Sequence, residues 1–253
     1  MADRDDASSP VELTFLGSGD AFGSGGRLQT CMHLRGGSSE MLVDCGATSL
    51  TAMKRAAVDP SGIGHVVVSH LHGDHFGGVP FLVLDGQFSR RERPLVVAGP
   101  PGTEARVTQA LEVLFPGSST TTRRFGLEFV ELADRVPTPV GPAVITGYTV
   151  EHSCGAPPYA LRIGYADRSI AYSGDTEWTD ALVDVAAGAD VFVCEAYFFD
   201  KRIKYHLDYM TLRAQLERLR CRRIVLTHMS GDMLDRRADV DLACAEDGLV
   251  ITI

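Results

Sequence analysis

The most informative stretch of this chain is Ser69-His70-Leu71-His72-Gly73-Asp74-His75. It places three histidines and one aspartate within six positions. One histidine in a loop is commonly structural, but four such groups packed together repel when protonated and are costly to bury unpaired. A metal ion removes both penalties, because imidazole nitrogens and carboxylate oxygens are natural metal ligands. The stretch therefore predicts a metal site.

The spacing within this stretch predicts two metal positions. His70 and His72 are two residues apart at the end of a strand predicted at residues 65–69, so both side chains can turn to one side. Asp74 and His75 fall in the turn that follows and face a neighbouring position. This arrangement suits two metal ions side by side.

Further polar residues that could take part in chemistry recur at the ends of predicted strands. Short apolar runs that predict strands alternate with amphipathic stretches that predict helices, and a polar residue stands at or just past the end of six of the strands. Loops that leave one edge of a sheet are where α/β proteins place their chemistry. The residues at these ends are Asp44, His70, His152, Asp175, Glu195 and His228.

Length and composition predict one α/β domain. The 253 residues suffice for a large core, and no linker divides the polar residues from one another. We expect a disordered tail at residues 1–10 and a single domain over residues 11–253. The strand patterns are both continuous and alternating, which predicts mixed sheets covered by helices.

Charge and cysteine content narrow the class of protein. Asp and Glu number 33 against 24 Lys and Arg, a net charge of −9, which argues against an extended grip on nucleic acid. Six cysteines without C-x-x-C spacing are typical of a reducing compartment. No run predicts a signal peptide or a membrane span, so we expect a cytoplasmic protein without membrane contact.

These motifs resemble the metallo-β-lactamase superfamily over nearly the whole chain. The resemblance includes residues 16–21, residues 42–46 around Asp44, and the segments that hold His152, Asp175 and His228. It implies a four-layer αββα sandwich, in which helices flank two mixed sheets. It also implies two divalent metal ions, with zinc favoured by the histidine-rich ligands and manganese as the alternative.

The resemblance assigns a role to each candidate ligand. His70, His72 and His152 would hold one ion, Asp74, His75 and His228 the second, and Asp175 would bridge the two. Asp74 would also orient a hydroxide that the metals activate by lowering the pKa of water towards ~7. Asp44 would orient a ligand histidine from behind.

The last third of the chain is similar to the phosphodiesterase branch of the superfamily. That branch includes ribonuclease Z, which matures the 3′ ends of transfer RNA, and a cyclic phosphodiesterase of phosphonate utilisation. His206 and Glu195 match its extra histidine and paired glutamate. His206 would stabilise the charge on phosphorus or protonate the leaving oxygen, and Glu195 would fix its tautomer. The alternative is that His206 only caps the helix predicted from Asp208.

Departures from ribonuclease Z are equally informative. Cys194 and Tyr197 replace a histidine and a threonine of its motif, and only 23 positions separate His152 from Asp175, too few for the arm that grips transfer RNA in bacterial ribonuclease Z. We therefore predict a hydrolase of small or cyclic phosphodiesters, with RNA as a less favoured substrate.

Other functions stay open at this point. The alternatives are a ribonuclease Z-like transfer-RNA 3′ endonuclease, a lactonase or other ester hydrolase of the same fold, and a member without turnover. Relatives in the superfamily are often homodimers, so we expect a homodimer. The segments expected to shape the pocket are residues 87–93, 115–124 and 154–159.

Overall fold

Two seven-stranded β-sheets form the middle of the fold in the computed structural model, which describes residues 10–37 and 39–253. The tail predicted at residues 1–10 lies, apart from Pro10, outside the described residues. Within the described part, no helix is long and apolar enough to cross a membrane.

The first sheet has the strand order β14-β1-β2-β3-β4-β5-β6. Strands β3 to β6 run parallel, and β14, β1, β2 and β3 pair antiparallel. The sheet is therefore mixed, as predicted. The strands are β1 Glu12–Gly17, β2 Cys31–Gly36, β3 Ser39–Val43, β4 His65–Val67, β5 Leu95–Gly99, β6 Leu127–Glu131 and β14 Val250–Thr252.

The second sheet has the order β13-β12-β11-β10-β9-β8-β7. Strands β10 to β13 are parallel, and β7 to β10 pair antiparallel, so this sheet is mixed too. The strands are β7 Thr138–Val140, β8 Ala143–Thr149, β9 Tyr159–Tyr165, β10 Arg168–Tyr172, β11 Val191–Glu195, β12 Ile224–Thr227 and β13 Ala243–Cys244.

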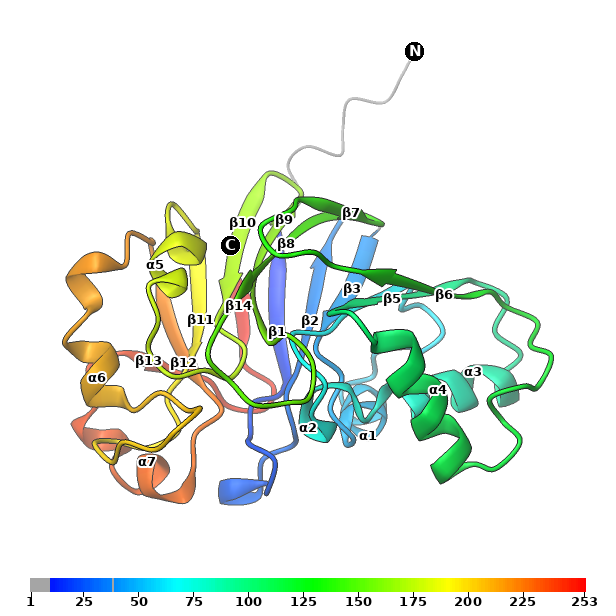
Figure 1. The fold of residues 1–253 in the computed structure, drawn as a ribbon, viewed down its shortest axis with the longest axis horizontal. Coiled ribbons are helices and arrows are strands. Elements are labelled where there is room, and N and C mark those ends of the chain that lie inside the picture. Colours follow the sequence, from blue (N-terminus) through cyan, green and yellow to red (C-terminus); the bar gives the residue numbers. More distant parts are fainter. Residues whose placement is uncertain (1–9, 38) are drawn as a thin grey trace, which may run out of the picture.

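Helices flank the two sheets on their outer sides. The first four helices lie beside the first sheet and the last three beside the second (Figure 1). This is the predicted four-layer αββα arrangement. The helices are α1 Ser49–Arg55, α2 Gly73–Phe76, α3 Val79–Phe88, α4 Thr103–Leu114, α5 Ala181–Ala186, α6 Tyr209–Arg213 and α7 Gly231–Asp235, with 3₁₀ turns at Ser24–Gly26, Leu216–Arg218 and Arg237–Asp239.

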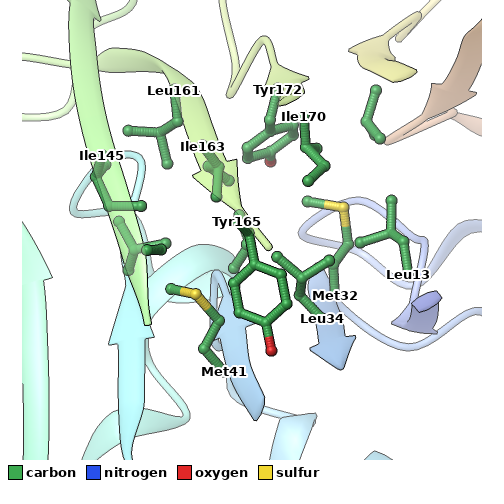
Figure 2. Packing of buried hydrophobic residues seen from close by; sticks show 14 of the residues in the cluster. Leu13, Met32, Leu34, Met41, Ile145, Leu161, Ile163, Tyr165, Ile170 and Tyr172 are labelled. Carbon is green, nitrogen blue, oxygen red and sulfur yellow. The ribbon is translucent and has the colours of Figure 1, made fainter. Parts of the chain in front are cut away.

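The central core lies between the sheets. Leu13 and Leu34 of the first sheet pack toward Leu161, Ile163 and Ile170 of the second (Figure 2). These side chains are at most 2% exposed. Because removing apolar surface from water is the main driving force of folding, this layer fixes the two sheets face to face.

Strand β4 shows why the sequence carries continuous apolar runs. Val67 belongs to the core between the sheets, whereas Val66 and Val68 pack in a second cluster under the helices of the first sheet. Successive side chains of a strand point to opposite faces, so a strand covered on both sides must be apolar throughout. Such strands hold the site residues at their ends on a rigid base.

The helix predicted over residues 209–219 is divided. α6 ends at Arg213, and a 3₁₀ turn follows at Leu216–Arg218. Leu212 in α6 and Leu219, which directly follows the 3₁₀ turn, are both buried in the cluster under the second sheet. The apolar period runs through both pieces, so the pattern alone could not show the break.

All six polar residues predicted at strand ends lie there. Glu195 is the last residue of β11, and the other five follow β3, β4, β8, β10 and β12 within three residues. Both sheets therefore deliver these side chains from the carboxyl ends of their strands.

Candidate metal centre

Three histidines meet between the ends of the two sheets. One ring nitrogen each of His70, His72 and His152 lies within 4.8 Å of the others, and we call this set the three-histidine cluster. His152 Nε2 is 3.0 Å from His72 Nδ1. His70 is fully buried, whereas His72 and His152 are partly exposed. The cluster can hold one cation and still be reached from outside.

A second set combines carboxylates with imidazoles. Asp74, His75, Asp175 and His228 are all buried and form what we call the mixed cluster. Asp74 Oδ2 is 3.2 Å from His228 Nε2 and 3.3 Å from His75 Nε2. Oxygen and nitrogen ligands at these separations suit a second cation.

Asp175 lies between the two clusters. Its Oδ1 is 3.3 Å from His75 Nε2, and its Oδ2 is 3.4 Å from His228 Nε2. The same Oδ2 lies 3.8 Å from His70 Nε2 and 4.0 Å from His152 Nε2. This position is the one that a bridging carboxylate requires.

Local backbone geometry places these ligands. His72 caps α2, so Asp74 and His75 stand in the first turn of that short helix. Gly174 precedes Asp175 with a φ of 58°, and a Cβ there would lie 2.7 Å from the carbonyl oxygen of Tyr159. Only glycine tolerates this turn. His228 itself has a φ of 57°, a strained conformation that surrounding contacts must hold.

Asp44 supports both clusters from behind. Its Oδ2 accepts hydrogen bonds from His75 Nδ1 at 2.7 Å, Tyr172 Oη at 2.9 Å and Ser69 Oγ at 2.9 Å. Ser69 Oγ in turn lies 3.1 Å from His70 Nδ1. With Nδ1 of each histidine engaged here, Nε2 of His75 and of His70 is left to face the clusters. Such partners fix the tautomer and raise the basicity of a ligand histidine.

The residues present fit metal ions. His70 Nε2, His75 Nε2 and Asp175 Oδ1 are buried and, among the described residues, have no hydrogen-bond partner. Buried polar atoms are nearly always paired, so three unpaired ones that converge call for an explanation. Each is a normal ligand atom for a divalent cation, and cations held at the two clusters would satisfy all three.

Burial governs the charge of the three-histidine cluster. It lowers the pKa of His70, of His72 and of His152, and neighbouring histidines lower each further. The cause is that a buried or crowded imidazole is poorly solvated when charged. These rings are therefore neutral, and ready to bind a metal, at neutral pH.

Carboxylates govern the charge of the mixed cluster. Burial opposes a charge on His75, but Asp175, Asp74 and Asp44 hold its pKa well above its usual range. Burial likewise opposes a charge on His228, yet Asp175 and Asp74 raise its pKa to about 9. Protons on these two rings balance the carboxylates, and a divalent cation can replace them.

His206 and Glu195 meet beside the clusters, as predicted. His206 Nδ1 is 3.0 Å from Oε2 of the fully buried Glu195, which also accepts from the backbone N–H of Thr176. Burial opposes a charge on His206, but the hydrogen bond to Glu195 raises its pKa. Asp208, not His206, caps α6. The helix-capping alternative for His206 is therefore wrong.

A cavity of about 370 Å³ lies over the clusters. It is lined by His206 and several cluster residues, together with Ala21, Phe22 and Tyr197. None of the three segments expected to shape the pocket lines it. Phe22 and Tyr197 were not predicted as pocket residues. For Tyr197 the sequence did offer a signal, because this tyrosine stands where the ribonuclease Z motif has a threonine. The Tyr197 ring stacks on His206 at 4.6 Å between centroids.

Comparison with known proteins places the chain in a family. Residues 11–245 match the family described as anti-Pycsar protein Apyc1. The chain belongs to this family. Its Apyc1-family domain thus spans almost all of the predicted single domain.

Named relatives support the predicted superfamily for this Apyc1-family chain. Ribonuclease Z of Anoxybacillus flavithermus is 28% identical, and the match covers 89% of this chain and 90% of that protein. The short form of human tRNase Z is 25% identical with a TM-score of 0.77, over 96% of this chain and 99% of that one. A metallo-beta-lactamase fold protein of Bacillus subtilis has a TM-score of 0.79 at 19% identity, over 97% of this chain and 100% of that one.

These likenesses confirm the metallo-β-lactamase superfamily, its fold and the class of metal-dependent hydrolases. They leave the substrate open. In the structure, the chain from His152 to Asp175 passes through β9 and β10, an antiparallel hairpin of the second sheet. More than half of the residues between these two positions belong to this hairpin, and the rest form short connections, which leaves no room for an inserted arm.

Proposed function

We propose that this chain is a phosphodiesterase that hydrolyses a small or cyclic phosphodiester with the help of two divalent ions. The observation that carries the proposal is the His206–Glu195 pair, a contact of 3.0 Å that stands beside the three-histidine cluster and the mixed cluster. A hydrolase needs such a proton donor when its leaving group is a poor one, as the alkoxide of a phosphodiester is.

The metals would be held by the two clusters, with Asp175 shared between them. When bound, the ions lower the pKa of water and neutralise phosphate oxygens. Zinc suits the histidine-rich ligand set, and manganese is the alternative because carboxylates share the site.

The chain's own residues supply the rest of the chemistry. Asp74 faces the cavity and can accept a hydrogen bond from an attacking water, which orients it. Glu195 raises the pKa of His206 against the effect of burial, which favours a proton on this ring. With Nδ1 held by Glu195, Nε2 is the nitrogen that can donate this proton to a leaving oxygen in the cavity.

Several features favour a small substrate over RNA. The cavity volume of about 370 Å³ is typical of a small-molecule site. No lysine or arginine is among the described residues that line it, and the net charge is −9. Gripping an RNA backbone depends on such cations. Ribonuclease Z-like processing of transfer RNA is the second candidate, because the curated relative at 28% identity carries that name.

A substrate panel tests the proposal. The metal-loaded protein is assayed with linear and cyclic alkyl phosphodiesters, transfer-RNA precursors and lactones. We expect hydrolysis of a small phosphodiester, and a loss of about 10²- to 10⁴-fold in kcat for His206→Ala, the usual contribution of a general acid. His65→Gln is the matched control, because His65 begins β4 at the end far from the site.

Three outcomes would contradict the proposal. Turnover confined to transfer-RNA precursors would favour the second candidate. Turnover confined to lactones, with His206→Ala unchanged, would indicate a different ester hydrolase of this fold. No metal-dependent turnover of any substrate would indicate a member that binds without reaction. The homodimer implied by the resemblance stays a prediction.

A further inference from the structure

Tyr205 has a backbone conformation that its surroundings must enforce. Its φ is 72°, in the left-handed region that a residue with a Cβ rarely adopts. Such a conformation persists only where the surrounding structure holds it in place. The Tyr205 side chain is 41% exposed, so burial of its ring does little to hold this conformation.

Two hydrogen bonds of the Tyr205 backbone provide the restraint. Its N–H donates to Glu177 Oε1 at 2.9 Å. Its carbonyl oxygen accepts from His152 Nδ1 at 2.8 Å. The peptide groups on both sides of Tyr205 are thus hydrogen-bonded to Glu177 and His152, next to the candidate metal centre.

Glu177 is itself anchored beside that centre. Its N–H donates to the carbonyl of Glu151 at 3.1 Å, and its carbonyl accepts from Thr176 Oγ1 at 2.7 Å. The Glu151 N–H in turn donates to Thr176 Oγ1 at 3.1 Å, which completes the network. Glu177 therefore projects from a rigid junction between the segments that carry His152 and Asp175.

The hydrogen bond between the Tyr205 carbonyl and His152 decides which ring nitrogen of His152 can bind a metal. A carbonyl oxygen only accepts, so the proton must be on Nδ1, and the lone pair is on Nε2. Nε2 is the atom that lies in the three-histidine cluster, 3.0 Å from His72 Nδ1. The Tyr205 carbonyl thus prepares His152 to bind a cation.

The same peptide also places His206, the next residue. His206 sits at the end of a loop, residues 200–207, and reaches Glu195 with Nδ1. The loop is also held at Asp200, which pairs with Arg236 at 2.9 Å, and at Leu207, whose carbonyl accepts from the Tyr197 N–H at 2.8 Å. A shift of the Tyr205 peptide would therefore move the His206 ring and the acceptor of His152 together.

We propose that Glu177 is a positioning residue that holds the Tyr205 peptide, and through it both the tautomer of His152 and the place of His206. Water can satisfy an exposed N–H, but only a fixed acceptor can also keep the strained φ in place. The part that concerns His206 rests on the proposed function, whereas the part that concerns His152 depends only on metal binding.

Three variants test this role. Glu177→Ala removes the acceptor, Glu177→Gln keeps an acceptor oxygen without the charge, and Glu151→Ala removes a neighbouring exposed carboxylate as the matched control. Zinc affinity is measured by competition with a chelator. kcat and KM are measured with an alkyl phosphodiester. The His152 tautomer is read from ¹⁵N chemical shifts of the metal-free protein.

For Glu177→Ala we expect zinc affinity and kcat each to fall about 10- to 100-fold, as for other residues that orient metal ligands. KM should change less than about twofold, because the residue does not touch substrate, and a mixture of His152 tautomers should appear. Glu177→Gln and Glu151→Ala should stay within about threefold of the unmodified protein, since the acceptor remains in both.

The proposal is overturned if Glu177→Ala behaves like Glu151→Ala in affinity and tautomer, or if Glu177→Gln loses as much as Glu177→Ala. If Glu177→Ala does not fold, Glu177→Gln decides alone: retained zinc affinity with a single His152 tautomer supports the role, and their loss overturns it. If no phosphodiester is turned over at all, the proposed function fails, while zinc affinity and the tautomer still decide the role of Glu177.

Discussion

The two ligand clusters are neighbours, yet they are built on opposite electrostatic principles. The three-histidine cluster contains imidazoles alone, and burial lowers the pKa of each ring. The mixed cluster surrounds two imidazoles with carboxylates, which raise the pKa of His75 and of His228 against the effect of burial. One set is neutral at neutral pH, and the other holds protons.

This difference shows what each cluster must do to bind a cation. The three-histidine cluster has free lone pairs, so it releases no proton when it binds an ion. The mixed cluster must exchange protons for the ion, because a ligand histidine has to be neutral. Its carboxylates, in return, supply the negative charge that a divalent ion needs. Asp175 faces both clusters.

The largest effect should come from Asp175→Asn, which removes the charge shared by the clusters. We expect kcat/KM to fall on the order of 10³-fold, since a metal centre contributes several kcal/mol to transition-state stabilisation. Affinity for both ions should fall as well. Steady-state kinetics and metal analysis measure the two effects.

Asp190→Asn is the matched control for this change, because Asp190 precedes β11 at the end far from the site and pairs with Arg222. It should change kcat/KM less than about threefold. Loss of affinity at only one cluster in Asp175→Asn would argue against a bridging role.

The pH dependence of metal binding should separate the clusters next. The pKa of His228 is raised from 6.5 to about 9 and that of His75 is raised too, so at pH 7 an ion entering the mixed cluster should release about two protons. Its affinity should therefore rise with pH until about pH 9. The three-histidine cluster should release almost none, and should weaken only as pH falls below about 6.5.

Calorimetric titration in buffers with different ionisation enthalpies measures the protons released. His72→Ala isolates the mixed cluster, and His228→Ala isolates the three-histidine cluster. Equal proton release in the two variants would remove the electrostatic distinction between the clusters.

The smallest effects concern the support behind each cluster. Asp44→Asn weakens the partner of His75, so we expect affinity at the mixed cluster to fall about 10- to 100-fold. Ser69→Ala removes the contact to His70 and one of the hydrogen bonds that Asp44 accepts, and leaves the contact between Asp44 and His75 in place. It should weaken the three-histidine cluster about fivefold, the value of one hydrogen bond. Chelator competition with each variant measures both. A larger effect of Ser69→Ala than of Asp44→Asn would reverse the assignment.

Much of the site could be predicted because its residues follow local rules. His70, His72, Asp74 and His75 are close in the sequence, so their grouping needs no knowledge of the fold. Glu195 and the more distant candidate ligands were predicted from their place at strand ends together with the resemblance of their motifs, since parallel strands bring their carboxyl ends to one edge.

Other features depended on contacts that no local pattern encodes. The segments expected to shape the pocket were wrong, because which loops meet over the clusters depends on how the two sheets pack. The role of Tyr205 was also invisible: a tyrosine in a polar loop carries no sign that its carbonyl will meet His152, which lies 53 positions away.

By itself, the sequence predicted a metal site, the superfamily and the strand ends that carry the candidate ligands. Residue type and spacing indicated the metal site, and the resemblance of the motifs indicated the superfamily. Only the tertiary structure decided the contrast between the clusters. The pKa of a histidine depends on which groups surround it after folding, and those groups come from strands of both sheets. The assignment of protons to His75 and His228, and of lone pairs to His70 and His152, is therefore a property of the fold.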